Sequence, residues 1–317
     1  MKLIVINSHG PMGSTTLSSI LEHFGFLSLP IRKVGLMKYL SGEYDLNNKF
    51  FQNRILEIAY KFTEKRISRS RSMIDKNENI LLHKNVIKEA LLFRDKKFNN
   101  FSNMYFEAYN LFNRHMIYKQ KKNYQGIIEL ATNSYLYEPK EYYDLFQKNF
   151  SEVIFFNLDR NFDNWLNSLM SQFFVREKIS IKNIIKKLSS IIRDYKNYSK
   201  YNEKNSIATN IKFENMFIPF NDIFLEQMEL KFNDIKKNNF WKLAKYDHYG
   251  YLLNYDETFK IFDDKINFIS KLSKKIAIKL FNKKNSNIIE ISIYDLMFQI
   301  SFLVDILRFK FMRWKKN

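Results

Sequence analysis

The feature that most constrains the fold lies at the start of the chain, where a short apolar run meets a glycine-containing turn. The run Leu3–Ile6 is apolar and partly β-branched, which is typical of a buried strand in a parallel sheet. The turn Ser8–Gly13 follows it, and the hydroxyl residues Ser14–Thr16 are suited to the first turn of a helix. A strand, a tight turn and a helix in this order predict an α/β protein.

Further strands and helices alternate along the first two thirds of the chain. Strands are predicted at 26–31, 126–131, 152–158 and 211–214, helices at 50–67 and 140–149, and a turn into a helix at 159–174. The basic stretch 64–123 has a helical pattern without strand signals, which indicates a helical insertion. We therefore expect a parallel sheet flanked by helices in a single domain, 1–317, with an α/β core at 1–220 and a helical C-terminal region at 221–317.

Composition removes several classes of function. The chain has no cysteine, which excludes thiolate metal sites, iron–sulfur clusters, disulfides and a cysteine nucleophile. Its 52 Lys and Arg against 33 Asp and Glu give a net charge of +19, which favours an anionic partner. AT-rich codons favour Lys, so the base composition of the genome explains part of that positive charge as well as an anionic partner does. The basic runs come with no nucleic-acid-binding motif, so we expect no nucleic acid partner.

The first chemical motif is the turn and helix start after the first strand. Backbone N–H groups at the positive end of a helix dipole suit a phosphate group. The candidate phosphate-binding residues are Gly10, Pro11, Met12, Gly13, Ser14, Thr15 and Thr16. A complete phosphate loop needs a Lys before the Ser/Thr, and no Lys occurs between Lys2 and Lys33, which disfavours an ordinary kinase or triphosphatase. A plain capped turn is the alternative interpretation.

The second motif follows the strand predicted at 152–158. Arg160 comes at the carboxyl end of that strand, and Ser168 lies on the helix predicted after it. A guanidinium and a hydroxyl at the same sheet edge as the glycine turn could hold a second phosphate group.

With both motifs present, the chain resembles the sulfotransferase superfamily, whose fold is like that of P-loop nucleoside triphosphatases. The segment Met12–Leu17 is similar to the family's 5′-phosphosulfate loop, and Arg160–Ser168 has the Arg-to-Ser spacing of its 3′-phosphate motif. A third segment, Ile211–Phe217, looks like the strand that follows in the family. The resemblance covers residues 1–220. The chain departs from the family pattern at three places, because Met12 stands where a Lys or Arg is usual, Gly and Ser are exchanged at positions 13 and 14, and Phe162 replaces a Pro.

The resemblance implies transfer of a sulfuryl group from 3′-phosphoadenosine-5′-phosphosulfate, without a metal, to a hydroxyl or amine of a carbohydrate, glycolipid or small molecule. A general base must take the acceptor's proton. The family often has this base shortly after the second strand, where the segment Leu27–Lys33 offers none. Glu43 and His9 are therefore rival candidates. His23, His83, His115 and His248 have no partner at ligand spacing, so no metal site is expected.

Two other classes stay open: a kinase on the same fold, and a non-catalytic sulfotransferase-like binding protein, which would explain Met12. The chain's start lacks a cleavable signal and no stretch is apolar enough to span a bilayer, so a cytoplasmic location is expected. The C-terminal segment 291–316 ends in alternating aromatic and basic residues, which suit peripheral contact with the inner face of a membrane. A closing helix packed on the domain is the favoured interpretation. The sequence leaves the oligomeric state open.

Overall fold

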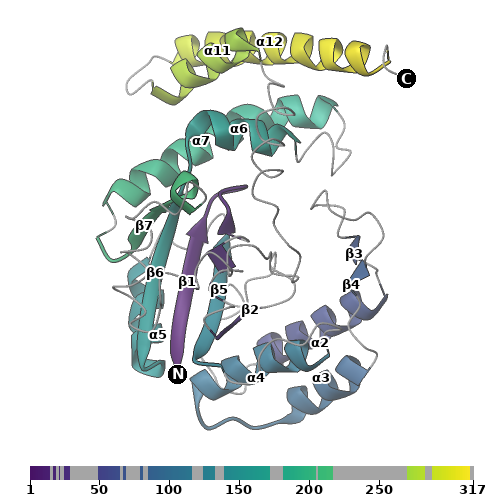
Figure 1. Cartoon of the computed structure of the whole chain (residues 1–317), viewed down its shortest axis with the longest axis vertical. Helices are drawn as coiled ribbons and strands as arrows, with labels where there is room; N and C mark the ends of the chain where they lie inside the picture. Colours follow the sequence, from purple (N-terminus) through teal and green to yellow (C-terminus); the bar gives the residue numbers. More distant parts are fainter. Residues whose placement is uncertain are drawn as a thin grey trace. The chain divides into compact units, whose positions relative to one another are not determined.

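A computed structural model describes the fold of this chain (Figure 1). The described residues are 1–14, 17–18, 21, 25–28, 49–64, 67–68, 79–80, 85–115, 124–132, 139–171, 181–204, 206–216, 270–282 and 288–314. By their contacts, the residues group into two compact units, which interleave along the chain. The first comprises 1–8, 13–158 and 207–253, and the second 9–12, 159–206 and 254–317. The single domain expected from the sequence stays a prediction.

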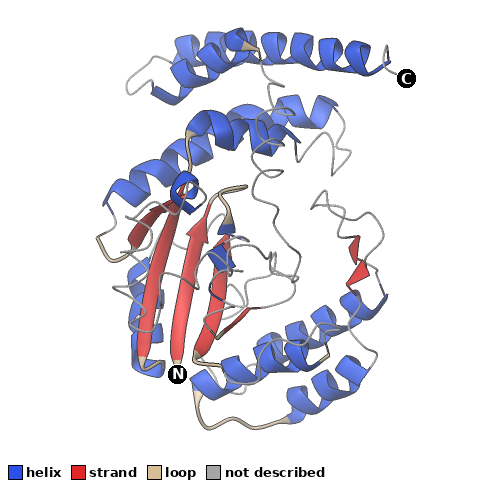
Figure 2. Ribbon diagram, in the orientation of Figure 1, coloured by secondary structure: helices blue, strands red, loops and turns tan. Residues whose placement is uncertain are grey.

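The first unit is built on a five-stranded sheet in the order β2-β5-β1-β6-β7, labelled in Figure 1 and drawn in red in Figure 2. The strands are β1 (Lys2–Ser8), β2 (Phe26–Ser28), β5 (Gly126–Thr132), β6 (Glu152–Asp159) and β7 (Thr209–Lys212). The pairs β1–β5, β1–β6 and β2–β5 are parallel. The side chains of Leu3–Ile6 in β1 are fully buried, as expected for the central strand of a sheet covered on both faces. The α/β class is thus confirmed.

Helices α4 (Phe101–Arg114) and α5 (Pro139–Asn149) cover the sheet with a layer of aromatic side chains. The ring of Tyr105 lies 6.4 Å from that of Phe146 in α5 and 6.2 Å from that of Phe150. Asn100 caps the start of α4, because its side chain accepts hydrogen bonds from the amides of Ser102 and Asn103. The aromatic side chains of this layer bury one face of the sheet.

The insertion is only partly helical. Two short strands, β3 (Ile67–Ser68) and β4 (Asn79–Ile80), pair antiparallel, so the expectation of a region without strands is wrong. The sequence predicts that the helix before this region ends at Ile67, but helix α2 (Lys49–Glu64) ends at Glu64, because Ile67 already belongs to β3. Strands of two residues are too short for an alternating pattern to reveal them.

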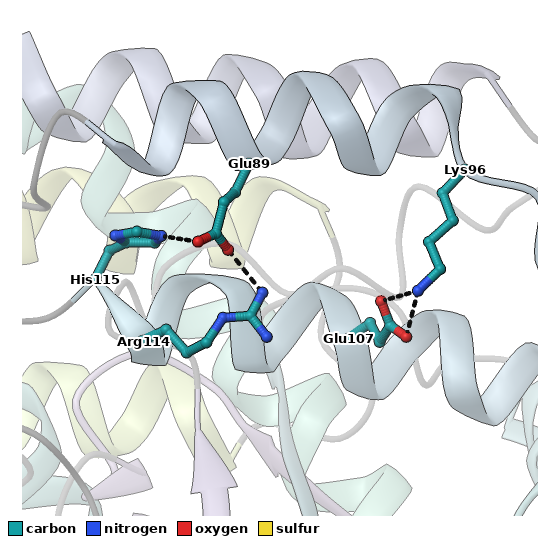
Figure 3. A network of polar contacts seen from close by, with 5 residues as sticks. All are labelled: Glu89, Lys96, Glu107, Arg114 and His115. Atoms are coloured by element: carbon teal, nitrogen blue, oxygen red, sulfur yellow. Dashed lines mark hydrogen bonds and ion pairs between the residues drawn. The ribbon is translucent and has the colours of Figure 1, made fainter.

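Helix α3 (Asn85–Asp95) packs on α2 and is tied to α4 by ion pairs (Figure 3). Glu89 accepts from Arg114 at 2.7 Å and lies 2.9 Å from His115, and Lys96 binds Glu107 at 2.6 Å. Partial burial by itself would raise the pKa of Glu89, but the hydrogen bond from Arg114 and the nearby His115 outweigh it and hold the pKa below its ordinary value. These contacts are largely exposed, so each contributes little to stability.

The second unit contains four described helices: α6 (Phe162–Ser171), α7 (Ile181–Lys204), α11 (Lys271–Asn282) and α12 (Ile288–Trp314). Phe281 of α11 stacks on Phe162 of α6, with ring centres 4.9 Å apart. Helices α11 and α12 lie side by side, and the Ser273 hydroxyl of α11 donates to the buried Asp305 of α12 at 2.8 Å (Figure 1). No helix among the described residues is long and apolar enough to cross a membrane.

Helix α12 packs on the unit through a face different from the one its sequence suggests. The apolar positions at helical spacing, Leu296, Ile300, Leu303 and Leu307, are between 37% and 58% exposed. The buried side is instead formed by the large side chains Phe298, Phe302 and Ile306. The favoured expectation is a closing helix packed on the domain. Helix α12 does pack on its unit, but through Phe298, Phe302 and Ile306 and not through the apolar positions on which the expectation is based.

Candidate functional site

The turn His9–Met12 after β1 belongs to the second unit and is held by hydrogen-bond donors within that unit. The indole N–H of Trp165 donates to the carbonyl oxygen of His9 at 2.8 Å, and the amide of Met12 donates to the carbonyl oxygen of Gly10 at 2.9 Å. Arg160 Nη1 donates to the carbonyl oxygen of Pro11 at 2.6 Å. Three successive carbonyl groups of the turn thus have a donor, which fixes the backbone of the turn.

Two glycines are required by the backbone of the turn. Gly10 has φ +65° and Gly13 has φ +90°, in the left-handed region that side chains strongly disfavour. A Cβ at position 13 would lie 2.2 Å from Cδ2 of Phe213, which leaves no room for a side chain. The helix that follows starts at Ser14, and the amide of Leu17 donates to the carbonyl oxygen of Gly13 at 3.0 Å. This arrangement confirms the predicted strand, turn and helix start.

Arg160 follows β6 directly and is only 3% exposed, which is unusual for a guanidinium. Its backbone carbonyl accepts a hydrogen bond from the hydroxyl of Tyr195 in α7. The next residue, Asn161, caps α6, because its side chain accepts from the amide of Asp163 at 2.9 Å. The Arg-Asn pair of the second motif therefore has two local roles, since Asn161 starts the helix and Arg160 reaches back to the turn.

His9 is enclosed by aromatic rings. It is 7% exposed, and its ring stacks on Trp165 and on Tyr198 with centroid distances of 5.8 and 5.9 Å. Burial lowers the pKa of His9 below its ordinary value, against the opposing effects of the Asp194 carboxylate and a hydrogen bond with the backbone of Ile191. Within the described part of the chain, its buried Nδ1 atom has no hydrogen-bond partner. The imidazole is therefore neutral at pH 7 and keeps an acceptor atom.

Met12 is the residue of the turn at which the resemblance described above leads us to expect a cation. Its side chain is fully buried, and its sulfur accepts a hydrogen bond from the amide of His9 at 3.3 Å. The thioether thus fills the inside of the turn, and the positive charge beside the turn is carried by Arg160.

The other predicted site residues are only partly covered by the structure. Ser168 lies on α6, partly buried, six residues after the start of that helix. Thr15, Thr16 and Glu43 lie outside the described residues. Among the described residues, no group of three or more His, Asp or Glu side chains is arranged to hold a metal ion.

Sequence reasoning missed a row of asparagines across three neighbouring strands, near the carboxyl ends of β1 and β6 and at the second residue of β7. Asn7 of β1 donates to Asn157 of β6 at 3.1 Å, and Asn157 donates to Asn210 of β7 at 3.1 Å. Asn7 and Asn157 are almost fully buried. The sequence carries a signal of this row, because a polar residue breaks the apolar run near the end of both strands: Asn7 in β1 and Asn157 in β6.

The strand order explains why the two motifs meet. After β1 the chain crosses to β2, beyond β5, whereas after β6 it continues to β7 on the opposite side of β1. In open α/β sheets, such a reversal between neighbouring strands marks the crevice where ligands bind, at the carboxyl ends of the strands. The turn after β1 and the segment that begins at Asp159 both follow those ends.

No protein-family model matches the chain, and no curated protein matches its sequence. Function must therefore be argued from the residues of the site and their geometry.

Proposed function

We propose that this protein is a sulfotransferase of the P-loop-like type, which moves a sulfuryl group from 3′-phosphoadenosine-5′-phosphosulfate to a hydroxyl or amine of a carbohydrate, glycolipid or small-molecule acceptor. The observation that carries the proposal is the hydrogen bond from Arg160 to Pro11 at 2.6 Å. It links Pro11, directly before the segment that resembles the 5′-phosphate motif, to the first residue of the segment that resembles the 3′-phosphate motif. Both follow strand ends, where an open α/β sheet binds its ligands.

In the proposed complex, the helix start after Gly13 faces the 5′-phosphosulfate, and Arg160 with Ser168 holds the 3′-phosphate. Transfer forms a bond between sulfur and the acceptor oxygen or nitrogen while the bond from sulfur to the bridging phosphate oxygen breaks. Adenosine 3′,5′-bisphosphate leaves, and the acceptor's proton passes to a base. Because Met12 carries no charge, the buried guanidinium of Arg160 supplies positive potential close to the turn, where low exposure strengthens it.

His9 fits the chemical needs of the base, since its lowered pKa keeps the imidazole neutral at pH 7 and its Nδ1 atom can accept a proton. Its enclosure between Trp165 and Tyr198 limits access for an acceptor, which keeps Glu43 as the rival candidate.

The uncharged Met12 favours one alternative, a sulfotransferase-shaped protein that binds nucleotide without turnover. A kinase on the same fold is the other, although the turn lacks the Lys that a triphosphate requires. All three make different predictions for ligand binding.

The test is isothermal titration calorimetry of the full chain with adenosine 3′,5′-bisphosphate, and separately with ATP and Mg²⁺, supported by thermal shift. Preferential binding of the bisphosphate, followed by label transfer from ³⁵S-labelled donor to pooled acceptors, supports the sulfotransferase. Binding without transfer selects the non-catalytic alternative. Preference for ATP with Mg²⁺, or binding of neither ligand, overturns the proposal.

A further inference from the structure

Helix α12 presents a long row of exposed apolar side chains. Nine large apolar residues on this one helix are between 37% and 75% exposed. They are Ile289, Ile293, Leu296, Met297, Ile300, Leu303, Val304, Leu307 and Phe311, here called the α12 stripe. Single exposed apolar residues are normal on a protein surface, but a contiguous row of this size marks a surface that interacts.

The α12 stripe is not the surface by which the helix is held in its own unit. Phe298 and Phe302, on the other side of α12, are fully buried, and Asp305 accepts hydrogen bonds from the amide of Ser270 and the hydroxyl of Ser273. Helix α12 is therefore already anchored through one face, and its second apolar face is exposed.

The positions of the α12 stripe are symmetric about Ile300. Each residue 3, 4, 7 or 11 positions before Ile300 has a counterpart the same number of positions after it, out to Ile289 and Phe311. Eleven residues make slightly more than three helical turns, so the row runs nearly straight for roughly 33 Å from Ile289 to Phe311. A two-fold interface requires such a self-complementary surface, in which one residue meets its counterpart in the second copy.

The charges on α12 favour a second copy over a lipid surface. No Lys or Arg occurs in α12 before Arg308, whereas Glu290 lies at the opposite end of the stripe. An antiparallel pair brings Glu290 of one copy to the end that carries Arg308 in the other, which is electrostatically favourable. Helices that lie in a membrane surface instead carry cations along their length, beside the apolar face.

We propose that a second copy of this chain docks on the α12 stripe, with the two α12 helices antiparallel and the two Ile300 side chains meeting at the two-fold axis. A row of nine large apolar side chains offers an area of the order of the roughly 800 Å² that each partner buries in a standard interface. This proposal is independent of the proposed function.

The first test measures the mass of the full chain in solution by sedimentation velocity over a range of concentrations. The parent chain should be a dimer, and Ile300→Glu should be a monomer, because two buried like charges would face each other at the axis. Leu92→Glu is the matched control, since Leu92 on α3 is 66% exposed and lies outside the stripe. It should remain a dimer. Circular dichroism of each variant under conditions that keep it monomeric shows whether the fold is intact.

The second test fixes the orientation, and it uses the absence of native cysteine. Ile300→Cys should form a disulfide dimer on oxidation, because position 300 meets itself at the axis. Ile289→Cys should not, because it faces position 311, although the double variant Ile289→Cys with Phe311→Cys should. Mixing Ile300→Glu with Ile300→Lys should restore a dimer that neither variant forms alone.

Several outcomes would overturn the proposal. A parent chain that is monomeric at all concentrations excludes the dimer, and crosslinking of Ile289→Cys to itself indicates a parallel pair. A monomer that sediments with phosphatidylserine vesicles, and loses this with Ile300→Glu, assigns the stripe to a membrane surface. A monomer whose midpoint of thermal unfolding falls with Ile300→Glu, but not with Leu92→Glu, shows that the stripe packs within the chain itself.

Discussion

Arg160 and Pro11 are 149 residues apart in the chain, and the guanidinium of the first donates to the carbonyl oxygen of the second at 2.6 Å. A hydrogen bond from a charged, buried donor is stronger than one between neutral groups. The contact holds the turn after β1 and the start of α6 together, so any anion bound at the turn would lie close to a fixed positive charge.

The first prediction concerns the affinity for the bisphosphate. Arg160→Ala should weaken binding of adenosine 3′,5′-bisphosphate by about 10- to 100-fold, which corresponds to the loss of one charge-assisted hydrogen bond. Adenosine 5′-monophosphate, which lacks the 3′-phosphate, should lose clearly less affinity, because Arg160 acts on its 5′-phosphate only through the positive potential near the turn. Arg193→Ala serves as control, because Arg193 lies on α7 of the same unit and is exposed. Equal losses for both ligands in calorimetry would assign Arg160 a purely structural role.

The second prediction concerns the stability of the turn. Gly13→Ala should lower the free energy of unfolding by about 1–3 kcal/mol, because an alanine is strained at a φ of +90° and its Cβ forces Phe213 to move. Urea denaturation followed by circular dichroism measures the change. Ser14→Ala, at the next position, should cost less. An unchanged urea midpoint for Gly13→Ala would mean that the turn adopts a different backbone in solution.

Much of the sheet could be predicted from the sequence because its central strands are long apolar runs. The strands β1, β5 and β6 lie where their buried, β-branched and aromatic residues predict them. The predicted strand at 211–214 ends early, at Lys212, and a 3₁₀ turn η3 (Phe213–Met216) follows. Phe213 lies against Gly13, a contact between distant parts of the chain that a local pattern does not contain.

The α12 helix was predicted, but its buried face was not. Its sequence is apolar on two sides, and the buried side is the one that also carries Ser301 and Asp305. Both polar side chains pair with Ser273 of α11, so the partner on the neighbouring helix decides the packing. The asparagine row was missed for a related reason, since a single polar residue near a strand end looks like the end of an apolar run.

The third prediction concerns the buried carboxylate of Glu129 in β5, which accepts hydrogen bonds from the hydroxyls of Tyr105 and Tyr109. Tyr109→Phe should cost about 1–3 kcal/mol of stability, because Glu129 is fully buried and loses a donor. Tyr60→Phe, at an exposed tyrosine of α2, should change little. Equal urea midpoints for these two variants would contradict the pairing.

The same site predicts an effect at alkaline pH. Burial, followed by the charge of Glu129, raises the pKa of Tyr109 well above its ordinary value of 10.0. Because the folded state holds this proton more tightly, its contribution to stability is complete below pH 10 and is lost as the pH rises further. The parent chain should therefore lose stability above pH 10 more steeply than Tyr109→Phe does.

The fourth prediction concerns stability at acid pH. Burial lowers the pKa of His9 in the folded state below the 6.5 of an exposed imidazole. The unfolded chain therefore binds the proton more readily, so the His9 contribution is complete above pH 6.5 and is lost as the pH falls through the folded pKa. Thermal unfolding between pH 8 and pH 5 should show this loss, and His9→Gln should reduce it. An identical slope in both proteins would mean that His9 is not buried as a neutral group.

The last prediction separates the two candidate bases. An acceptor hydroxyl attacks sulfur efficiently only if a base takes its proton, and removal of that base should slow transfer by about 10²- to 10⁴-fold while bisphosphate binding persists. Glu43→Gln and His9→Asn are compared for transfer of ³⁵S-labelled sulfuryl groups and, in parallel, for bisphosphate affinity. The pH profile of the parent chain gives an independent answer, because the unperturbed pKa values of a carboxylate and an imidazole differ by about two units. If His9 is the base, its lowered pKa keeps the parent chain active somewhat below pH 6.5. The fall of activity at still lower pH, which reports protonation of the base, should then be absent only in the His9 variant. If both variants transfer at the parent rate, neither residue is the base.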